Sequence, residues 1–145
     1  MFYVLKKENS QTVNNIIDTK NCVCFYYWVN CGHCHQMMPT WMKLCKDYGK
    51  DVNIINIELA DIQYLNPQSR NIMGFPTIMS YKNGIKKEEF NGSRDYDSLE
   101  KFLMKSKILT NPSPPIRKKI SLTKKKANSI KKTIKKTKKP VKPKK

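Results

Sequence analysis

At 145 residues the chain can fold one ordinary domain with its own core and still leave a shorter segment over. Its net charge is +18, but 15 of the 29 Lys and Arg residues lie in 112–145, where no acidic residue occurs. No run approaches the ~18 apolar residues of a membrane-spanning helix, and we expect no secretory signal, because the apolar run after Met1 is too short for one.

The cysteine count adds a second exclusion. Five cysteines is an odd number, so a fully paired disulfide framework is not expected, and most of the thiols should stay reduced. Without a secretory signal or a membrane span, we expect the protein in the cytosol or nucleus, or in a virion if its source is a virus.

The first half of the chain predicts a helix, a strand and a second helix. Val13, Ile16 and Ile17 mark the first helix. The apolar run from Cys22 to Val29 predicts a central strand that is buried on both faces. From Cys34 the pattern becomes that of an amphipathic helix ended by Gly49. Its expected buried residues are Cys34, Met38, Trp41, Met42 and Cys45.

The second half predicts another strand, a hairpin and a closing helix. Val52–Leu59 is a buried strand, and residues 62–72 form a short helix or turn around Pro67. Two strands then flank Asn83-Gly84, a strong hairpin signal. A helix after Asp95 closes the domain. This alternation predicts an α/β fold, with helices on both faces of a mixed sheet.

The charge distribution divides the chain into a domain and a basic tail. Residues 1–111 carry 14 basic and 11 acidic residues, so they form a domain of nearly balanced charge. Residues 112–145 are Lys-rich and have too few apolar side chains to offset the entropy of ordering, so we expect a disordered tail. Residues 116–145 could hold nucleic acid or another polyanion through phosphate contacts, without base specificity.

The sequence Cys31-Gly-His-Cys34 carries the chemistry. Cys31 follows the predicted strand directly, at the N-terminus of a helix, where unpaired N–H groups and the positive dipole end stabilise a thiolate. Cys34 lies one turn later on the same side, within reach of a mixed disulfide at Cys31. Gly32 allows a tight turn, and a charged His33 would favour the thiolate and make a disulfide more oxidising.

Two other interpretations of this motif remain open. The pair could be two buried cysteines without redox chemistry. A zinc site would have to recruit Cys22, Cys24, His33 or His35. Cys22 and Cys24 lie inside an apolar strand, and no second pair follows at finger spacing, so zinc is the weaker alternative.

Several motifs together resemble the thioredoxin superfamily, and the protein disulfide isomerase branch in particular. They are CGHC, a proline five residues later at Pro39, the tetrapeptide Gly-Phe75-Pro76-Thr77, the hairpin IMSYKNG, and residues 90–103 as last strand and helix. The resemblance covers roughly residues 10–107.

The resemblance implies roles for individual residues. Cys31 would be the nucleophile and Cys34 the resolving thiol. Pro76 would be cis, leaving the backbone of Phe75 and Thr77 free to hold a client chain.

It also implies an arginine that swings toward the site. Arg94 stands at that position, although an exposed arginine that caps the start of a helix is an equally good interpretation. No metal or organic cofactor is implied, and the substrates would be cysteine-containing client proteins. We expect a monomer.

Two positions depart from the family pattern. Phe25 stands six residues before the first cysteine, where relatives carry a buried acid that accepts the proton of the resolving thiol. Asn30 replaces the usual tryptophan. Losing the acid should slow deprotonation of Cys34, unless His33, His35 or water substitutes.

The sequence thus predicts a protein thiol–disulfide oxidoreductase that works through Cys31 and Cys34. The rival hypothesis is a redox-inert or weakly active adaptor whose basic tail binds nucleic acid. Cys22, Cys24 and Cys45 are expected to be core thiols. Heavy use of Lys, Asn and Ile is typical of AT-rich genomes, and fits thioredoxin-like proteins of large DNA viruses.

Overall fold

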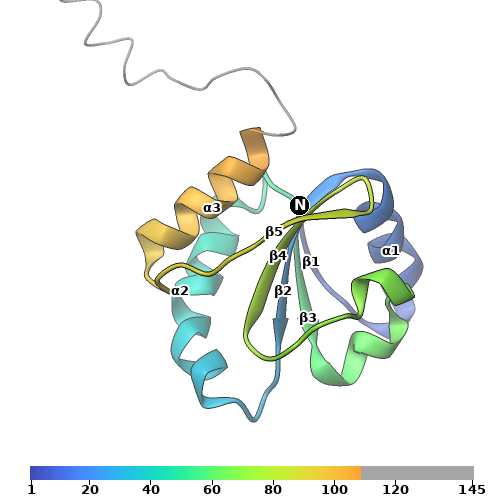
Figure 1. Ribbon diagram of the computed structural model, residues 1–145, viewed down its shortest axis with the longest axis horizontal. Coiled ribbons are helices and arrows are strands. Elements are labelled where there is room, and N and C mark those ends of the chain that lie inside the picture. Colours follow the sequence, from blue (N-terminus) through green and yellow to red (C-terminus); the bar gives the residue numbers. More distant parts are fainter. Residues whose placement is uncertain (109–145) are drawn as a thin grey trace, which may run out of the picture. The chain divides into compact units, whose positions relative to one another are not determined.

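The computed structural model describes residues 1–108, with the side chain of the last of these left out. They form a five-stranded sheet with the strand order β1–β3–β2–β4–β5 (Figure 1). The strands are β1 (Phe2–Val4), β2 (Asn21–Tyr27), β3 (Ile54–Glu58), β4 (Thr77–Lys82) and β5 (Ile85–Glu89). β1, β3 and β2 are parallel, whereas β4 is antiparallel to both β2 and β5. The predicted mixed sheet is confirmed.

Helices cover both faces of this sheet, as the alternating pattern predicted. Figure 1 shows α1 on one side and α2 with α3 on the other. The helices are α1 (Ser10–Thr19), α2 (Gly32–Tyr48) and α3 (Tyr96–Ile108). Three short 3₁₀ segments are η1 (Lys7–Asn9), η2 (Leu59–Tyr64) and η3 (Pro67–Ser69). No helix within residues 1–108 is long and apolar enough to span a bilayer.

The core has two halves because the side chains of β2 alternate between the faces of the sheet. Cys22, Cys24 and Tyr26 pack with Ile17 and the rest of the α1 face. The other half contains Val23 and Phe25 of β2, Met37, Trp41 and Leu44 of α2, and Leu99 and Phe102 of α3. The central strand is therefore buried on both sides, as its continuous apolar run indicated.

Strand β1 was missed by the sequence interpretation, which began the fold with a helix. Phe2 pairs with Ile54 of β3, and the backbone N–H of Ile54 donates to the Met1 carbonyl at 2.9 Å. A strand of three residues is too short to show a two-residue period, so only its pairing with β3 identifies it.

Helix α2 also differs from its predicted buried face. Met37 and Leu44 are buried, whereas Met42 is 41% exposed. Position 42 lies about 80° around the helix axis from Cys34 at 3.6 residues per turn, so it turns toward the edge of the buried stripe. Helix α2 begins at Gly32, has Pro39 inside it and ends at Tyr48, with the predicted terminator Gly49 as its C-cap.

The predicted hairpin is confirmed at Asn83 and Gly84, whose φ angles are 50° and 80°. Both residues occupy the left-handed region that a two-residue hairpin turn requires. The turn docks on the end of α1, because the Gly84 N–H donates to the Ile17 carbonyl at 2.8 Å. The predicted strand at 22–29 ends two residues early, at Tyr27, and the chain then turns toward α2. The predicted tail, residues 112–145, lies outside the described residues.

Candidate active site

Cys31 is the N-cap residue of α2, at the point where the chain leaves β2. Its backbone is extended, with φ −95° and ψ 119°, and its Sγ accepts the N–H of Cys34 at 3.4 Å. The free N–H groups of the first turn need such an acceptor. A sulfur in this position is stabilised most when it is a negatively charged thiolate. Gly32 has no positive φ, and a Cβ there would meet no atom within 4 Å. The turn therefore does not depend on glycine, contrary to the expectation from the sequence.

The surroundings of Cys31 favour its thiolate. A hydrogen bond from the Cys34 side chain lowers the pKa of Cys31 most, and the backbone N–H groups of Cys34 and His33 add to this, against the opposing effect of partial burial. The positive charge of Arg94 lowers the pKa further. Cys31 is therefore the more acidic thiol of the pair.

Cys34 has the opposite character. It is only 1% exposed, and burial raises its pKa to about 11, although a backbone hydrogen bond from Trp28 acts the other way. The two thiols, one helical turn apart, thus differ in pKa. The lower pKa of Cys31 suits a nucleophile, and the higher pKa of Cys34 suits a partner that stays protonated. Both are free thiols here.

The loop that precedes β4 lies against Cys31. The Phe75–Pro76 peptide is cis, and the Phe75 carbonyl accepts the Cys31 thiol at 3.8 Å. Thr77 begins β4 and pairs with Tyr26, while its hydroxyl donates to the Gly74 carbonyl at 2.7 Å. The structure therefore brings Phe75, Pro76 and Cys31 together, and in this state the Phe75 carbonyl is engaged by the thiol.

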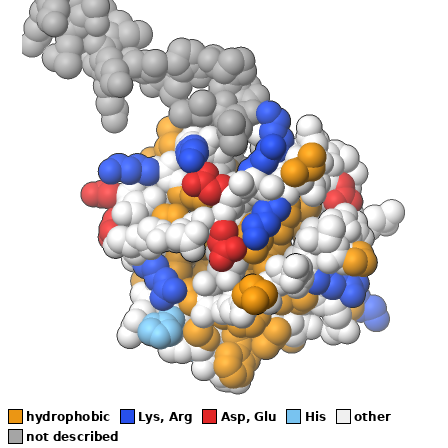
Figure 2. All heavy atoms as spheres, viewed as in Figure 1, with side chains coloured by type: hydrophobic (Ala, Val, Ile, Leu, Met, Phe, Trp, Pro, Cys, Tyr) orange, Lys and Arg blue, Asp and Glu red, His pale blue; other side chains and the backbone are white. Residues whose placement is uncertain are grey.

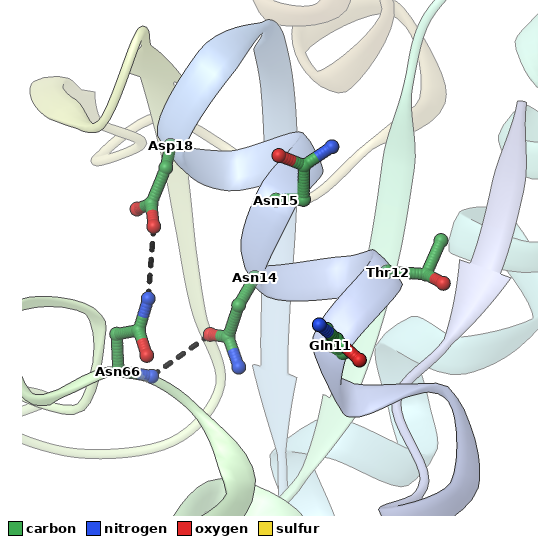
Figure 3. Close-up of a pocket in the computed structure, with 6 residues that line it drawn as sticks. All are labelled: Gln11, Thr12, Asn14, Asn15, Asp18 and Asn66. Carbon is green, nitrogen blue, oxygen red and sulfur yellow. Dashed lines mark hydrogen bonds between the residues drawn. The ribbon is translucent and has the colours of Figure 1, made fainter.

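The chain leading to this loop is fixed by polar contacts with the rest of the domain. The Asn66 amide donates to Asp18 of α1 at 2.8 Å, and its backbone N–H donates to the Asn14 side chain at 2.8 Å (Figure 3). The buried Tyr26 hydroxyl donates to the Ser69 carbonyl at 2.9 Å. The hollow in Figure 3, about 560 Å³, is lined by six polar side chains: Gln11, Thr12, Asn14, Asn15, Asp18 and Asn66. Because its central side chains bond to one another, we assign it a structural role.

Arg94 is exposed and lines a cleft of about 210 Å³ together with Met37, Pro76 and Phe90. Its charge lowers the pKa of both Cys31 and Cys34. It does not cap α3, because Asp95 accepts the Ser98 N–H at 2.8 Å.

The two histidines differ in their contacts. His33 is exposed in the first turn of α2, and a hydrogen bond from its backbone lowers the pKa of Cys31. His35 is also exposed, but its Nε2 forms a hydrogen bond with the Val29 carbonyl. His35 therefore contacts the loop in front of Cys31.

Phe25, at the position where the family pattern has an acid, lies in an aromatic cluster. Phe25 is fully buried, with its ring centroid 4.8 Å from Trp41 and 5.4 Å from Tyr27. Asn56, its partner on β3, is buried and accepts the Trp41 indole N–H at 2.8 Å. The sequence interpretation overlooked Asn56; the signal was a polar residue inside an otherwise apolar strand.

Hydrophobic side chains surround this end of the molecule. Figure 2 shows them gathered at its lower end, where β2 runs into α2 in Figure 1. Trp28 and Val29, which precede Cys31, are exposed. Met73, which precedes the cis-proline loop, is 95% exposed.

The remaining cysteines lie in the core. Cys22, Cys24 and Cys45 are buried, and burial raises the pKa of Cys24 and of Cys45, the latter to about 12. Within residues 1–108, no three His, Cys, Asp or Glu side chains are grouped so that they could hold a metal ion.

A parallel β1–β3–β2 unit extended by an antiparallel hairpin, with a paired-cysteine turn facing a cis-proline loop, is the arrangement of a thioredoxin fold. Residues 2–105 match the family model described as Thioredoxin, and the chain belongs to this family. A solved structure of thioredoxin from Malassezia sympodialis covers 73% of this chain and 93% of its own, with a TM-score of 0.60 and 20% identity, which shows the fold.

Curated relatives include protein disulfide isomerases. The Saccharomyces cerevisiae protein disulfide-isomerase is 31% identical over 105 residues, 71% of this chain and 20% of that protein. Human protein disulfide-isomerase A2 is 31% identical over 100 residues, 68% of this chain and 19% of that protein. The chain thus spans about a fifth of the length of these relatives. The predicted isomerase-like family is confirmed, while the viral source remains a prediction.

Proposed function

We propose that this chain is a protein thiol–disulfide oxidoreductase that exchanges disulfides with cysteine-containing client proteins. The observation that carries the proposal is the asymmetry of its two thiols. Cys31 is partly exposed, caps α2 and has a lowered pKa, whereas Cys34 is buried one turn later with a raised pKa. Only the exposed, acidic thiol can reach and attack a protein disulfide.

In the reducing direction the reaction has two steps. The Cys31 thiolate attacks one sulfur of a client disulfide; a Cys31–client bond forms, and the other client sulfur leaves as a thiolate that takes up a proton. Cys34 then loses its proton and attacks the Cys31 sulfur, which releases the second client thiolate. The client gains two electrons and the Cys31–Cys34 disulfide forms. The oxidising direction is the reverse.

We assign the neighbouring residues supporting roles in this exchange. The backbone of Phe75 and Thr77, on either side of Pro76, would hold an extended client segment beside Cys31 once the client sulfur displaces the thiol from the Phe75 carbonyl. Arg94 would stabilise the thiolate that develops at Cys34, since its charge lowers the pKa there. A protonated His33 would favour the Cys31 thiolate.

The test is reduction of insulin disulfides by the full-length chain with dithiothreitol as reductant. We expect turnover well above the reductant alone, and its loss in both Cys31→Ser and Cys34→Ser. Cys45→Ser is the matched control, since it removes a buried thiol away from the site and should keep activity. Equal rates for the wild type and Cys31→Ser would overturn the proposal.

The second candidate is an adaptor of low redox activity, tethered to nucleic acid by residues 116–145. Two observations favour it: buried Phe25 stands where the family pattern has an acid, and the segment 112–145 carries 15 basic residues. This candidate predicts weak insulin reduction combined with tight duplex binding at low salt.

A further inference from the structure

One peptide unit of the loop in front of Cys31, between Trp28 and Val29, forms hydrogen bonds at both of its ends. The carbonyl of the Trp28–Val29 peptide accepts the Cys31 N–H at 3.0 Å, and the N–H of the same peptide donates to the Glu58 carboxylate at 3.3 Å. These two bonds lie at opposite ends of one amide group. A carboxylate at the N–H end polarises the amide and strengthens the bond at its carbonyl end.

Glu58 is itself firmly placed. It is the last residue of β3, pairs with Tyr27 across the sheet and is 9% exposed. Its second oxygen accepts the Ala60 N–H at 2.6 Å, which caps η2. Both carboxylate oxygens are thus occupied by backbone N–H groups. It is also the only acidic residue in β2 and β3, the strands that lead to the site.

We propose that Glu58 is a positioning residue of the redox site, which acts on Cys31 through the Trp28–Val29 peptide and keeps it in the conformation that caps α2. The proposal rests on the proposed function only for the benefit that it assigns to Glu58. The geometry at Cys31 is the same whether or not the protein exchanges disulfides with a client.

The consequence for Cys31 has a defined sign. Without Glu58, the peptide loses its N–H partner, Cys31 loses a firm anchor, and its sulfur is less often in place to accept the Cys34 N–H. The thiolate is then less stabilised and the pKa of Cys31 rises. Removing a nearby negative charge would by itself do the opposite and lower this pKa. The direction of the change therefore separates positioning from simple electrostatics.

The charged surroundings of Glu58 supply a control. Lys6 and Asp61 form a salt bridge at 2.9 Å, and both act electrostatically on the Tyr27 hydroxyl, as Glu58 does. Asp61→Asn therefore removes a carboxylate from the same neighbourhood. Asp61 has no hydrogen bond to the 28–31 loop, so this variant changes the charge without releasing the loop.

The experiment measures the pKa of Cys31 from the pH dependence of its alkylation, with peptide mapping, in the full-length chain. We expect Glu58→Ala to raise this pKa by about half to one unit, which lowers the thiolate fraction at neutral pH roughly 3- to 10-fold. Glu58→Gln keeps one acceptor oxygen and should raise the pKa by less. Asp61→Asn should leave the pKa unchanged or slightly lower.

Far-UV circular dichroism and thermal unfolding show which variants are folded. If Glu58→Ala does not fold, Glu58→Gln decides the question. A higher pKa in any folded Glu58 variant, absent in Asp61→Asn, supports the proposal, and an unchanged or lower pKa in every folded Glu58 variant overturns it. Because alkylation needs neither client nor turnover, the result is independent of the insulin assay.

Discussion

The backbone N–H of Cys34 donates to the Sγ of Cys31 at 3.4 Å, so the first cysteine serves as the cap of the helix that carries the second. The same bond that completes the first turn of α2 stabilises negative charge on Cys31. This bond therefore contributes both to the start of the helix and to the lowered pKa of Cys31, beside the larger effect of the Cys34 side chain.

Selective alkylation tests this activation. At a pH of about 6 to 7, iodoacetamide should label Cys31 well before the other four cysteines, because only the thiolate reacts and the pKa of Cys31 is lowered. Burial raises the pKa of Cys45 to about 12, so that site should stay thiol. Mass-mapped labelling in which Cys45 or Cys22 reacts first would contradict the assignment.

Trapping of intermediates tests the two roles. Cys34→Ser should accumulate mixed disulfides with client proteins, since the attack at Cys31 still occurs but resolution cannot. Cys31→Ser should accumulate none. Non-reducing gels of the tagged variants measure this, with the double Ser variant as background. Equal trapping by the two single variants would rule out the division of roles.

A carboxylate introduced beneath the site tests the missing acid. Phe25→Glu should speed resolution of the mixed disulfide at neutral pH by accepting the Cys34 proton. It should also cost about 3 to 5 kcal/mol of unfolding free energy, because Phe25 is fully buried against Trp41.

Stopped-flow exchange and urea unfolding measure the two effects, with Phe25→Leu as the apolar control. If the Glu variant folds but its resolution rate equals that of the Leu variant, another group already transfers the proton, and His33 and His35 are the next residues to replace.

The buried pair of Trp41 and Asn56 predicts a stability effect. Trp41→Phe removes the indole N–H that donates to the Asn56 side chain at 2.8 Å and leaves a buried amide oxygen without this partner. We expect a loss of about 1 to 3 kcal/mol in the free energy of unfolding from this cause. In urea titrations, adding Asn56→Leu to Trp41→Phe should restore part of the loss. A double variant less stable than the single one would show that packing dominates.

The basic segment predicts binding to nucleic acid that depends on salt. Full-length protein should bind duplex DNA without sequence preference, with a log–log salt slope of roughly −0.9 per phosphate neutralised. Fluorescence anisotropy between ~50 and ~200 mM salt measures this slope. The 1–111 fragment should bind weakly. Equal affinity of the two proteins, or a flat salt dependence, would exclude anchoring through residues 116–145.

Much of the fold could be predicted because its signals are local. The hairpin depends on the φ preferences of Asn83 and Gly84, and α1 depends on the spacing of Val13, Ile16 and Ile17. Strand β1 gave no such signal, because its stability comes from pairing with β3, more than forty residues away in the chain. The exposed Trp28 and Val29 extended the apolar run and so hid the true end of β2 at Tyr27.

The chemistry available to this protein can be read from its residues alone: two cysteines at helical spacing after a buried strand, and a Gly-Phe-Pro-Thr loop further along. The groups that surround the two thiols are known only from the folded chain. Glu58 follows the cysteines by more than twenty residues, and it reaches the Val29 N–H because β3 pairs with β2 in parallel, which brings the carboxyl ends of both strands to one edge of the sheet. Contacts of this kind depend on strand order and register, and these arise from the packing of the whole domain.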